Sequence, residues 1–387
     1  MVARPAGVLA AAIAIAIAVT TPARAEPPPL PDPVAITAYD TGTAGFNSVV
    51  AIAKALEDTG GTTVRVLAAG NDLSRLGPVR SGRAVASGMG GGVYFAQEGV
   101  FEFANPDWGP QKVRVMAGTT GCNGGHLAVA ADTGVRTMAD LAGRRIGFVV
   151  GAPALNQNTL GLLAFAGLSA ADVRIVEFSS YNAMAEGLLN DEVDAIFSVT
   201  IARSARELEA SPRGLVWPPL PHADAAGWER LLARAPYYTR TRASCGAGGL
   251  SPEQPMEMGV YPYPMLTTYA DQPPAVIHAL TARIFAGYEA YKDAAPGAAG
   301  YAAHLQNLTW AVPYHDGAIA AYRDLGLWSD AAQSWNDRLI ARQEALAAAW
   351  AGYAAGTDAT GEAFAAGWLA ARAEALAAGG FTDGLGR

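Results

Sequence analysis

Cysteine and histidine are scarce in this sequence, and their scarcity narrows the chemistry that the chain can perform. The 387 residues include two cysteines and five scattered histidines. No Walker A loop, G-x-S-x-G turn or H-E-x-x-H pair occurs. Cys122 and His126 lie close together, but the glycines between them indicate a loop, and no third group completes a metal or catalytic site. We therefore expect a protein that is not an enzyme and that uses neither a metal nor a cofactor.

Positive charge is also in deficit, which argues against nucleic acid as a partner. Lys and Arg number 27 against 35 Asp and Glu, so the formal charge is −8. A nucleic-acid-binding surface needs basic side chains to neutralise phosphates. Apolar residues make up 51% of the chain, which is typical of a packed globular protein rather than a disordered one.

Long apolar runs are missing after residue 25, whereas a short one lies before it. Arg4 precedes an apolar stretch at 7–20, and Ala23-Arg24-Ala25 has the form of a cleavage site. The stretch is too short to span a bilayer, so residues 1–25 are predicted to be a signal peptide that is cut after Ala25. Residues 26–33 form a proline-rich lead-in. The mature protein is expected to be exported to the periplasm, and its length of about 360 residues suffices for two domains.

The remaining chain alternates between strand-like and helix-like patterns, which is typical of α/β folds. In a first series, strands are expected at 36–39, 63–67, 84–89, 112–117 and 127–131, with helices at 48–57 and 93–101 and a capped helix start at 71–76. A second series has strands at 145–150, 173–177 and 193–199 and helices at 160–166 and 182–189. The chain is therefore predicted to hold two similar α/β units.

The last part of the chain is predicted to return to the first unit and to end in helices. Residues 256–266 have strand character but contain prolines, so an irregular or edge strand is expected there. Helices are expected at 275–290, 317–324 and 333–351. Residues 360–378 can form a helix, but their alanine-rich composition leaves open whether it docks onto the rest.

Several segments resemble, in order and spacing, those of a known family. They are TGTAGFN at 41–47, RSGRAVASGMGGGVYFA at 80–96, TGVRTMADLAGRRIGF at 133–148, AEGLLNDEVDAIFSV at 185–199, APYYT at 235–239 and VPYHDGAIAAYRDLGLW at 312–328. Over roughly residues 36–330 the chain resembles the TAXI family of extracytoplasmic solute-binding proteins. These proteins serve tripartite ATP-independent periplasmic (TRAP) transporters.

The resemblance implies an α/β, periplasmic-binding-protein-like (type II) bilobal fold with a cleft and crossing hinge strands. The expected boundaries are 34–130 for the first part of lobe 1, 131–250 for lobe 2, 251–350 for the return to lobe 1 with C-terminal helices, and 351–387 for an alanine-rich tail. The implied function is to capture a small polar solute, a carboxylate or an amino-acid-like molecule, and to deliver it to the membrane-embedded TRAP subunits. The alternatives are a ligand-sensing module for a membrane sensor kinase and, less favoured, an enzyme on the same fold.

Ligand contacts are expected first in the loop between the first strand and the first helix. A solute sits outside the carboxyl ends of the strands in such folds, and the unpaired N–H groups of a helix start favour an anion or an acceptor oxygen. Small residues also allow the backbone to approach the solute. The residues predicted for this role are Thr41, Gly42, Thr43, Ala44, Gly45, Phe46 and Asn47. A tight turn without a ligand is the simpler interpretation.

Further contacts are expected from two other places. In lobe 1, a glycine run followed by an aromatic residue could cradle a carboxylate or serve only as a turn: Gly90, Gly91, Gly92 and Tyr94. In lobe 2, amide, hydroxyl and guanidinium groups follow strands, although capping or solvation would also explain them. These residues are Asn156, Gln157, Asn158, Tyr181, Ser198, Thr200 and Arg203.

The two cysteines, Cys122 and Cys245, are expected to form one disulfide because the protein is predicted to be exported. A reactive thiol and two separate buried thiols are the alternatives. On the implied bilobal fold, Cys122 precedes the exit from lobe 1 and Cys245 precedes the return. We therefore expect the bond to clip the two crossing segments together and to restrain the hinge.

Overall fold

The structure is a computed structural model that describes residues 1–2 and 29–383. The predicted signal peptide, apart from its first two residues, and the beginning of the proline-rich lead-in lie outside the described residues.

The first lobe is built on a five-stranded sheet in the order β2-β1-β3-β12-β4. Its strands are β1 (Val34–Ala38), β2 (Val64–Ala68), β3 (Ala86–Met89), β4 (Val113–Gly118) and β12 (Met265–Tyr269). Strand β1 is parallel to β2 and β3, whereas β12 is antiparallel to β3 and β4. Three helices connect the parallel strands or follow them: α1 (Ala44–Gly60), α2 (Asp72–Arg80) and α3 (Gly92–Glu98).

The second lobe is built on a seven-stranded sheet in the order β10-β11-β5-β8-β6-β7, with β9 paired to β5. The strands are β5 (Gly125–Ala130), β6 (Arg145–Val149), β7 (Arg174–Phe178), β8 (Ala195–Val199), β9 (Leu215–Val216), β10 (Thr239–Ala243) and β11 (Met256–Val260). Its helices are α4 (Pro153–Phe165), α5 (Tyr181–Leu189), α6 (Arg203–Ala210) and α7 (Ala225–Arg234).

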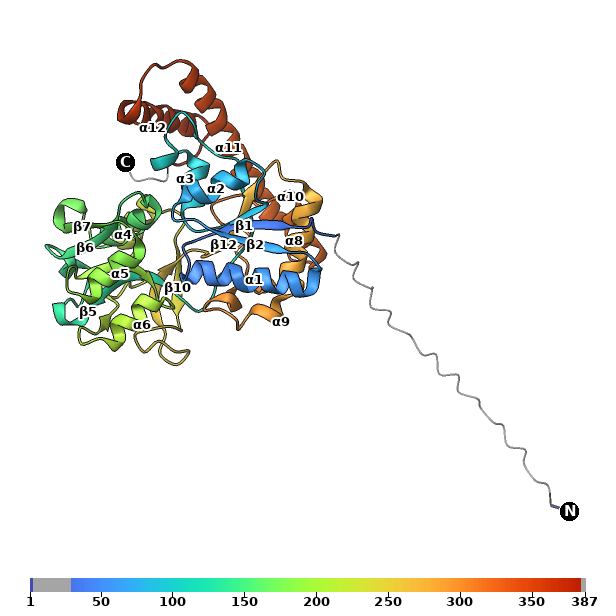
Figure 1. The fold of residues 1–387 in the computed structure, drawn as a ribbon, viewed down its shortest axis with the longest axis horizontal. Coiled ribbons are helices and arrows are strands. Elements are labelled where there is room, and N and C mark those ends of the chain that lie inside the picture. The colour runs from blue at the N-terminus through green and yellow to red at the C-terminus, as the bar shows by residue number, and fades with distance from the viewer. Residues whose placement is uncertain (3–28, 384–387) are drawn as a thin grey trace.

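The two sheets share one plan, which confirms the predicted pair of similar units. In the first lobe the strand order β2-β1-β3 is followed by the antiparallel β12. In the second lobe the order β7-β6-β8 is followed by the antiparallel β5. Figure 1 shows the two lobes side by side. The fold is therefore the α/β, periplasmic-binding-protein-like bilobal fold.

Two short segments cross between the lobes. Residues 119–124 join β4 to β5, and residues 261–264 join β11 to β12. The crossings meet where the Thr119 hydroxyl donates to the Tyr263 carbonyl. Strands β5 and β11 thus pair in the second sheet, although the boundaries expected from the sequence had placed residues 125–130 and 256–260 with the first lobe.

The cysteines form the predicted disulfide, but its position differs from the expected clip between crossings. Cys122 lies in the first crossing, and its Cα is 5.4 Å from that of Cys245. Cys245 lies just after β10, in the loop that leads to β11, and the second crossing begins only after β11. The bond therefore ties the first crossing to the second lobe. The sequence predicted a strand at 256–266 but did not show that its first part, β11, pairs in the second sheet before the chain returns.

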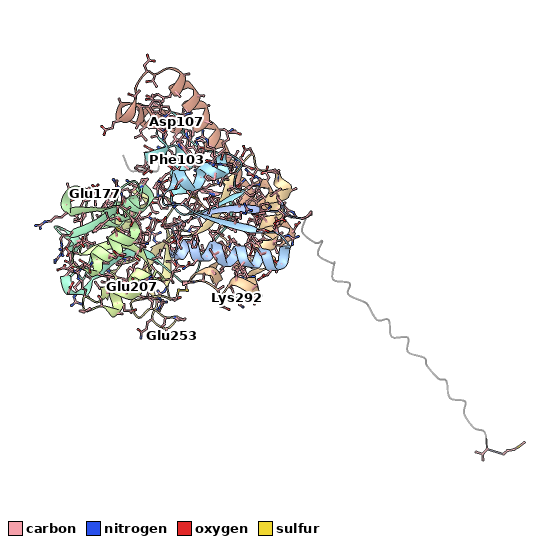
Figure 2. All side chains as sticks on the ribbon, in the orientation of Figure 1. Phe103, Asp107, Glu177, Glu207, Glu253 and Lys292 are labelled. Atoms are coloured by element: carbon pink, nitrogen blue, oxygen red, sulfur yellow. A yellow bond between two sulfur atoms is a disulfide. The ribbon has the colours of Figure 1, made fainter. Side chains whose placement is uncertain are left out.

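The helices after β12 cover the first lobe. They are α8 (Pro274–Ala286), α9 (Tyr288–Tyr291), α10 (Asp316–Asp324), α11 (Asp330–Ala355) and α12 (Gly361–Ala378). Helices α11 and α12 form a hairpin, coloured red in Figure 1, that lies against α3. Phe103, which is fully buried, lies between this hairpin and the first lobe (Figure 2). None of the helices in residues 29–383 is both long and apolar enough to cross a bilayer.

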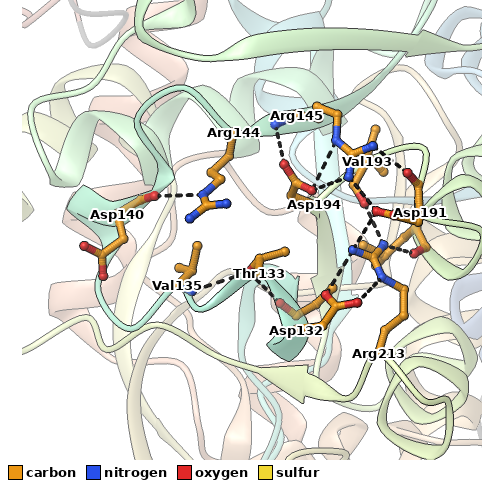
Figure 3. A network of polar contacts seen from close by, with 12 residues as sticks. Asp132, Thr133, Val135, Asp140, Arg144, Arg145, Asp191, Val193, Asp194 and Arg213 are labelled. Carbon is orange, nitrogen blue, oxygen red and sulfur yellow. Dashed lines mark hydrogen bonds and ion pairs between the residues drawn. The ribbon is translucent and has the colours of Figure 1, made fainter.

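A network of ion pairs joins the amino ends of β6 and β8 to the segment that follows β5 in the second lobe (Figure 3). Arg145, at the start of β6, binds the Asp194 carboxylate through its backbone N–H at 2.8 Å and its Nη2 at 2.6 Å. Arg213 binds Asp132 at 2.9 Å and Asp191 at 3.1 Å. Helix α4 follows the opposite, carboxyl end of β6. The network therefore stabilises the sheet from which α4 extends to the first lobe.

Several predicted element boundaries were wrong, and two of the differences change the interpretation of the site. Helix α4 begins at Pro153, well before the expected residue 160, because proline is favourable in the first helical turn. Asn156, Gln157 and Asn158 therefore lie on a helix rather than in a loop. The single irregular strand expected at 256–266 is two strands, β11 and β12, because the prolines at 262 and 264 lie in the crossing between the sheets.

Candidate functional site

The start of α1, predicted to bind an anion, is covered by side chains of the protein itself. Thr43 caps the helix, and its hydroxyl accepts from the Phe46 N–H at 3.2 Å. The hydroxyl of Tyr263 lies against Gly45, 2.9 Å from the position that a Cβ atom would take. A Cβ atom on Gly45 would lie 2.5 Å from the ring of Tyr39, so only glycine fits there. The loop therefore packs closely against aromatic side chains of the protein, where the sequence had predicted close contact with a solute.

The glycine run before α3 is crowded in the same way. A Cβ on each glycine would meet another side chain, at 2.8 Å from Tyr39 Oη for Gly90, 3.0 Å from Tyr237 Cε2 for Gly91 and 2.1 Å from Asp72 Oδ2 for Gly92. The place predicted for a ligand carboxylate therefore holds the Asp72 carboxylate and two tyrosines. These glycines make room for the packing of the lobes onto each other.

A row of tyrosine rings connects the two lobes. The ring centroids are 5.2 Å apart for Tyr39 and Tyr263, 6.3 Å for Tyr263 and Tyr261, 5.5 Å for Tyr261 and Tyr237, and 5.7 Å for Tyr237 and Tyr94. Tyr39 and Tyr94 belong to the first lobe, whereas the others flank β10 and β11. We call these five tyrosines, together with Asn158, the interlobe seam. One continuous apolar cluster extends through it from lobe to lobe, so the lobes are closed on each other.

Asn158 joins helix α4 to the seam and is the predicted amide that the structure brings there. Its Nδ2 donates to the Tyr261 hydroxyl at 2.9 Å, and its Oδ1 accepts from the Tyr237 hydroxyl at 2.6 Å. Only 2% of Asn158 is exposed. Both polar atoms of the amide are thus satisfied within the protein, as buried amides generally are.

A buried ion pair lies beside the seam and was not predicted. Asp72 binds the Nη2 of Arg75, whose guanidinium lies 4.0 Å from the centroid of the Tyr39 ring. Arg75 Nη1 donates to the Ala69 carbonyl at 3.1 Å, but Arg75 Nε has no partner although the residue is 5% exposed. Burial lowers the pKa of Arg75, but the charge of Asp72 outweighs it and holds the pKa above its ordinary value. Arg75 is therefore a charged donor with spare capacity.

Tyr181 reaches the seam from the second lobe. Its hydroxyl lies 3.1 Å from Ser198 Oγ and 2.9 Å from Ser204 Oγ. Its proximity contributes to the raised pKa of Tyr263, after the larger effect of burial. Ser198 therefore contacts Tyr181, whereas Thr200 lies near the hinge, where its hydroxyl accepts from the N–H of Gly124 at 3.2 Å.

The other predicted residues lie apart from the seam or serve local structure. Thr41, Gly42 and Asn47 are exposed. Ala44 and Phe46 belong to the first turn of α1 and are half-buried, and Gln157 is half-buried on α4. The Asn156 side chain binds the backbone N–H and carbonyl of Val149, which closes the turn between β6 and α4. Arg203 is 83% exposed and pairs at 2.6 Å with Glu207, which is labelled on the second lobe in Figure 2.

The tyrosines and the Asp72–Arg75 pair were missed because nothing in the local pattern distinguishes them from core residues. A signal was nevertheless present. Two pairs of tyrosines, in APYYT and GVYPYPM, are separated from the glycine runs by long stretches of sequence. Adjacent glycines without side chains need bulky partners to fill the space, and the tyrosines are those partners.

The seam offers aromatic rings and few free polar groups, and the Asp72–Arg75 pair beside it adds one buried guanidinium and one carboxylate. Within residues 29–383, no group of three or more His, Cys, Asp or Glu side chains is placed to hold a metal ion.

Comparison with known proteins gives a partial family match and a set of related folds. The model of the NMT1/THI5-like family matches residues 109–216. No curated protein matches the chain significantly. Among solved structures, a protein from Bordetella bronchiseptica RB50 is 19% identical, with a TM-score of 0.44, over 78% of this chain and 90% of that one.

Two further structures are named for the solutes that they bind. The alkanesulfonate-binding protein SsuA from Xanthomonas axonopodis pv. citri, bound to MOPS, is 16% identical with a TM-score of 0.38, over 84% of this chain and 94% of that one. The periplasmic aliphatic sulphonate-binding protein SsuA from Escherichia coli is 14% identical with a TM-score of 0.39, over 83% and 87%.

Proposed function

We propose that this protein is an exported solute-binding receptor that closes its two lobes around a small polar solute. The observation that carries the proposal is the bilobal fold with two crossing segments, whose facing surfaces meet at a buried cation with an unpartnered donor. A hinge at residues 119–124 and 261–264 allows the lobes to separate, and a solute that contacts both lobes favours the closed state. The partial NMT1/THI5-like match supports the proposal.

The solute is proposed to carry a carboxylate, and the partner to be a TRAP-type transporter. Arg75 replaces Arg203 as the cation for the carboxylate, because Arg75 is buried at the seam and Arg203 is exposed. The partner is proposed from the TAXI resemblance alone. Export to the periplasm follows from the predicted signal peptide.

The first experiment is a thermal-shift screen of the chain from Glu26 onward, after partial unfolding has removed any solute carried over from expression. The panel holds dicarboxylates, amino acids, oxo-acids, aromatic acids and sugars. A solute that binds only the folded state raises Tm by mass action. We expect a carboxylated solute to raise Tm and to be recovered chemically unchanged by mass spectrometry. Conversion of the solute would instead indicate an enzyme, and no shift with any compound would contradict the receptor proposal.

A further inference from the structure

The hydroxyl of Tyr263 lies against the amino end of α1. A Cβ atom on Gly45, in the first turn of this helix of 17 residues, would lie 2.9 Å from the hydroxyl oxygen, and the helix dipole is positive at that end. Burial raises the pKa of Tyr263, and the positive charge of Arg75 offsets this only in part. A carboxylate oxygen at this position would be a charged acceptor at a helix start, and hydrogen bonds to charged acceptors are stronger than those to a neutral phenol.

Arg75 has a donor available for such an oxygen. Its Nη2 binds Asp72 and its Nη1 binds a carbonyl, whereas its Nε is buried without a partner. A buried donor without a partner costs free energy, which an incoming acceptor would recover. The guanidinium also lies over the ring of Tyr39, so it already forms one wall of the seam.

The surroundings of the Tyr263 ring are suited to a flat aromatic group. Tyr39 meets the ring at an interplanar angle of 65° and Tyr261 meets it at 74°. Edge-to-face packing of this kind favours an aromatic ring over a saturated one of similar size. The Tyr261 hydroxyl is already bound to Asn158, so this neighbour offers its ring rather than a hydrogen bond.

Tyr263 can leave this position without the unfolding of either lobe. It lies in the second crossing, residues 261–264, between the last strand of one sheet and the last strand of the other. It is half-buried, whereas its neighbour Tyr261 is buried. Separation of the lobes about the crossings would change the position of Tyr263 relative to Gly45.

We propose that Tyr263 is an internal substitute for the solute, and that the solute is a planar aromatic carboxylate that displaces it. The carboxylate would accept from the Gly45 N–H and from Arg75, and the ring would take the place between Tyr39 and Tyr261. This inference rests on the proposed receptor function and specifies the class of its solute.

The test of solute class compares matched acids by isothermal titration of the chain from Glu26 onward. Benzoate and 4-hydroxybenzoate are the aromatic probes, cyclohexanecarboxylate is the saturated control, and succinate and L-glutamate represent aliphatic solutes. We expect benzoate to bind about fivefold more tightly than cyclohexanecarboxylate, which is the usual size of an aromatic pair contribution. Equal binding of the two would overturn the inference. Binding of succinate or glutamate alone would overturn it and leave the receptor function standing, whereas binding of no compound would overturn both.

The role of Tyr263 is tested with matched tyrosine substitutions. Tyr263→Phe removes the hydroxyl that competes for Gly45, so benzoate should bind about fivefold more tightly than to the unchanged protein, as expected for one lost hydrogen bond. Tyr238→Phe is the control, because that buried hydroxyl has no partner and its loss should leave affinity unchanged. Weaker binding to the Tyr263 variant, or equal effects of the two substitutions, would overturn the displacement model.

Discussion

At the scale of single residues, His126 determines part of the response of the folded protein to acid. It lies in β5 opposite Ser198 and is fully buried. Burial lowers the pKa of His126 to about 4 from an ordinary value of 6.5. The unfolded chain therefore binds a proton near pH 6.5 while the folded protein resists protonation until about pH 4. Stability is fully present above pH 6.5 and is lost as the pH falls through this window.

The corresponding prediction concerns His126→Gln, which cannot ionise in this range. The loss of unfolding free energy between pH 7.5 and pH 4 should shrink by an amount on the order of 3 kcal/mol, as the size of the pKa shift implies. Urea unfolding at several pH values measures it. His304→Gln is the control, since His304 is exposed.

Glu102 affects the pH dependence of stability in the opposite direction to His126. A pH profile of one protein therefore contains both effects, and only a comparison between variants separates them. Burial, and then the charge of Asp72, raise the pKa of Glu102 to about 7. Its contribution to stability is present at low pH and is lost as the pH rises from about 4.5 to 7. Because both proteins retain Glu102, its effect cancels in the difference. A His126 variant with the same acid sensitivity as the unchanged protein would show that the histidine is not neutral in the fold.

The sequence indicated where the backbone permits close approach but not which side chains make that approach. The helix start at Gly45 and the run Gly90–Gly92 were singled out because small residues permit close approach, and the structure places Gly45, Gly90 and Gly91 against tyrosines of the seam and Gly92 against Asp72. The sequence could not show that Tyr39 and Tyr263 make that approach, because they come from distant positions. Arg203 was singled out because it follows a strand, and Arg75 was not considered because its burial is a tertiary property.

At the scale of secondary-structure elements, a buried ion cluster attaches the C-terminal hairpin to α3. Glu98, which is fully buried, binds Arg342 of α11 at 2.7 and 2.8 Å and also binds Arg372 of α12. Burial raises the pKa of Glu98, but the hydrogen bonds and charges of the two arginines outweigh it, so the carboxylate remains ionised. The alanine-rich segment whose docking the sequence left open is therefore held by charge as well as by apolar contacts.

Removal of this charge should detach the hairpin. We expect Glu98→Gln to reduce the unfolding free energy by about 3 to 5 kcal/mol, because it leaves the buried Arg342 without a carboxylate and leaves Arg372 with Asp383 alone. Denaturant unfolding measures the loss. Glu374→Gln, on the exposed side of α12, is the control and should change stability little.

The same substitution tests whether the hairpin supports the seam. Helix α3 carries Tyr94 and Phe95, whose rings contact Tyr237. If the hairpin positions α3, Glu98→Gln should also weaken the near-ultraviolet circular dichroism of the tyrosine row before global unfolding. An unchanged spectrum together with an unchanged unfolding free energy would show that α3 needs neither arginine.

At the scale of the whole molecule, the alternation of strands and helices predicted the bilobal architecture. It could not predict how the chain passes between the lobes. Both crossings are short, and β11 pairs in the second sheet although it lies in the segment, from residue 251 onward, that was expected to return to the first lobe. Pairing partners of such edge strands depend on long-range register, which local periodicity does not contain.

The path of the chain changes what the disulfide is expected to do. A clip between the two crossings would restrain the hinge, whereas the observed bond joins one crossing to the second lobe and leaves residues 261–264 outside the loop that it closes. Replacement of both cysteines, Cys122→Ser with Cys245→Ser, should lower the unfolding free energy by about 4 to 5 kcal/mol, because the closed loop spans a sequence separation of 123. Urea unfolding of the unchanged, disulfide-bonded protein and of the double serine variant measures this difference.

Solute affinity distinguishes the two possible roles of the disulfide, which are to restrain the hinge or to anchor the first crossing to the second lobe. With the observed connection, the double serine variant should bind its solute as tightly as the unchanged protein, because the seam and the second crossing keep their contacts. A bond that restrained the hinge would instead change affinity, since the cost of closing the lobes would differ. Lower stability with unchanged affinity therefore supports a disulfide that anchors the first crossing to the second lobe. A change in both stability and affinity would instead show that the first crossing governs closure of the lobes.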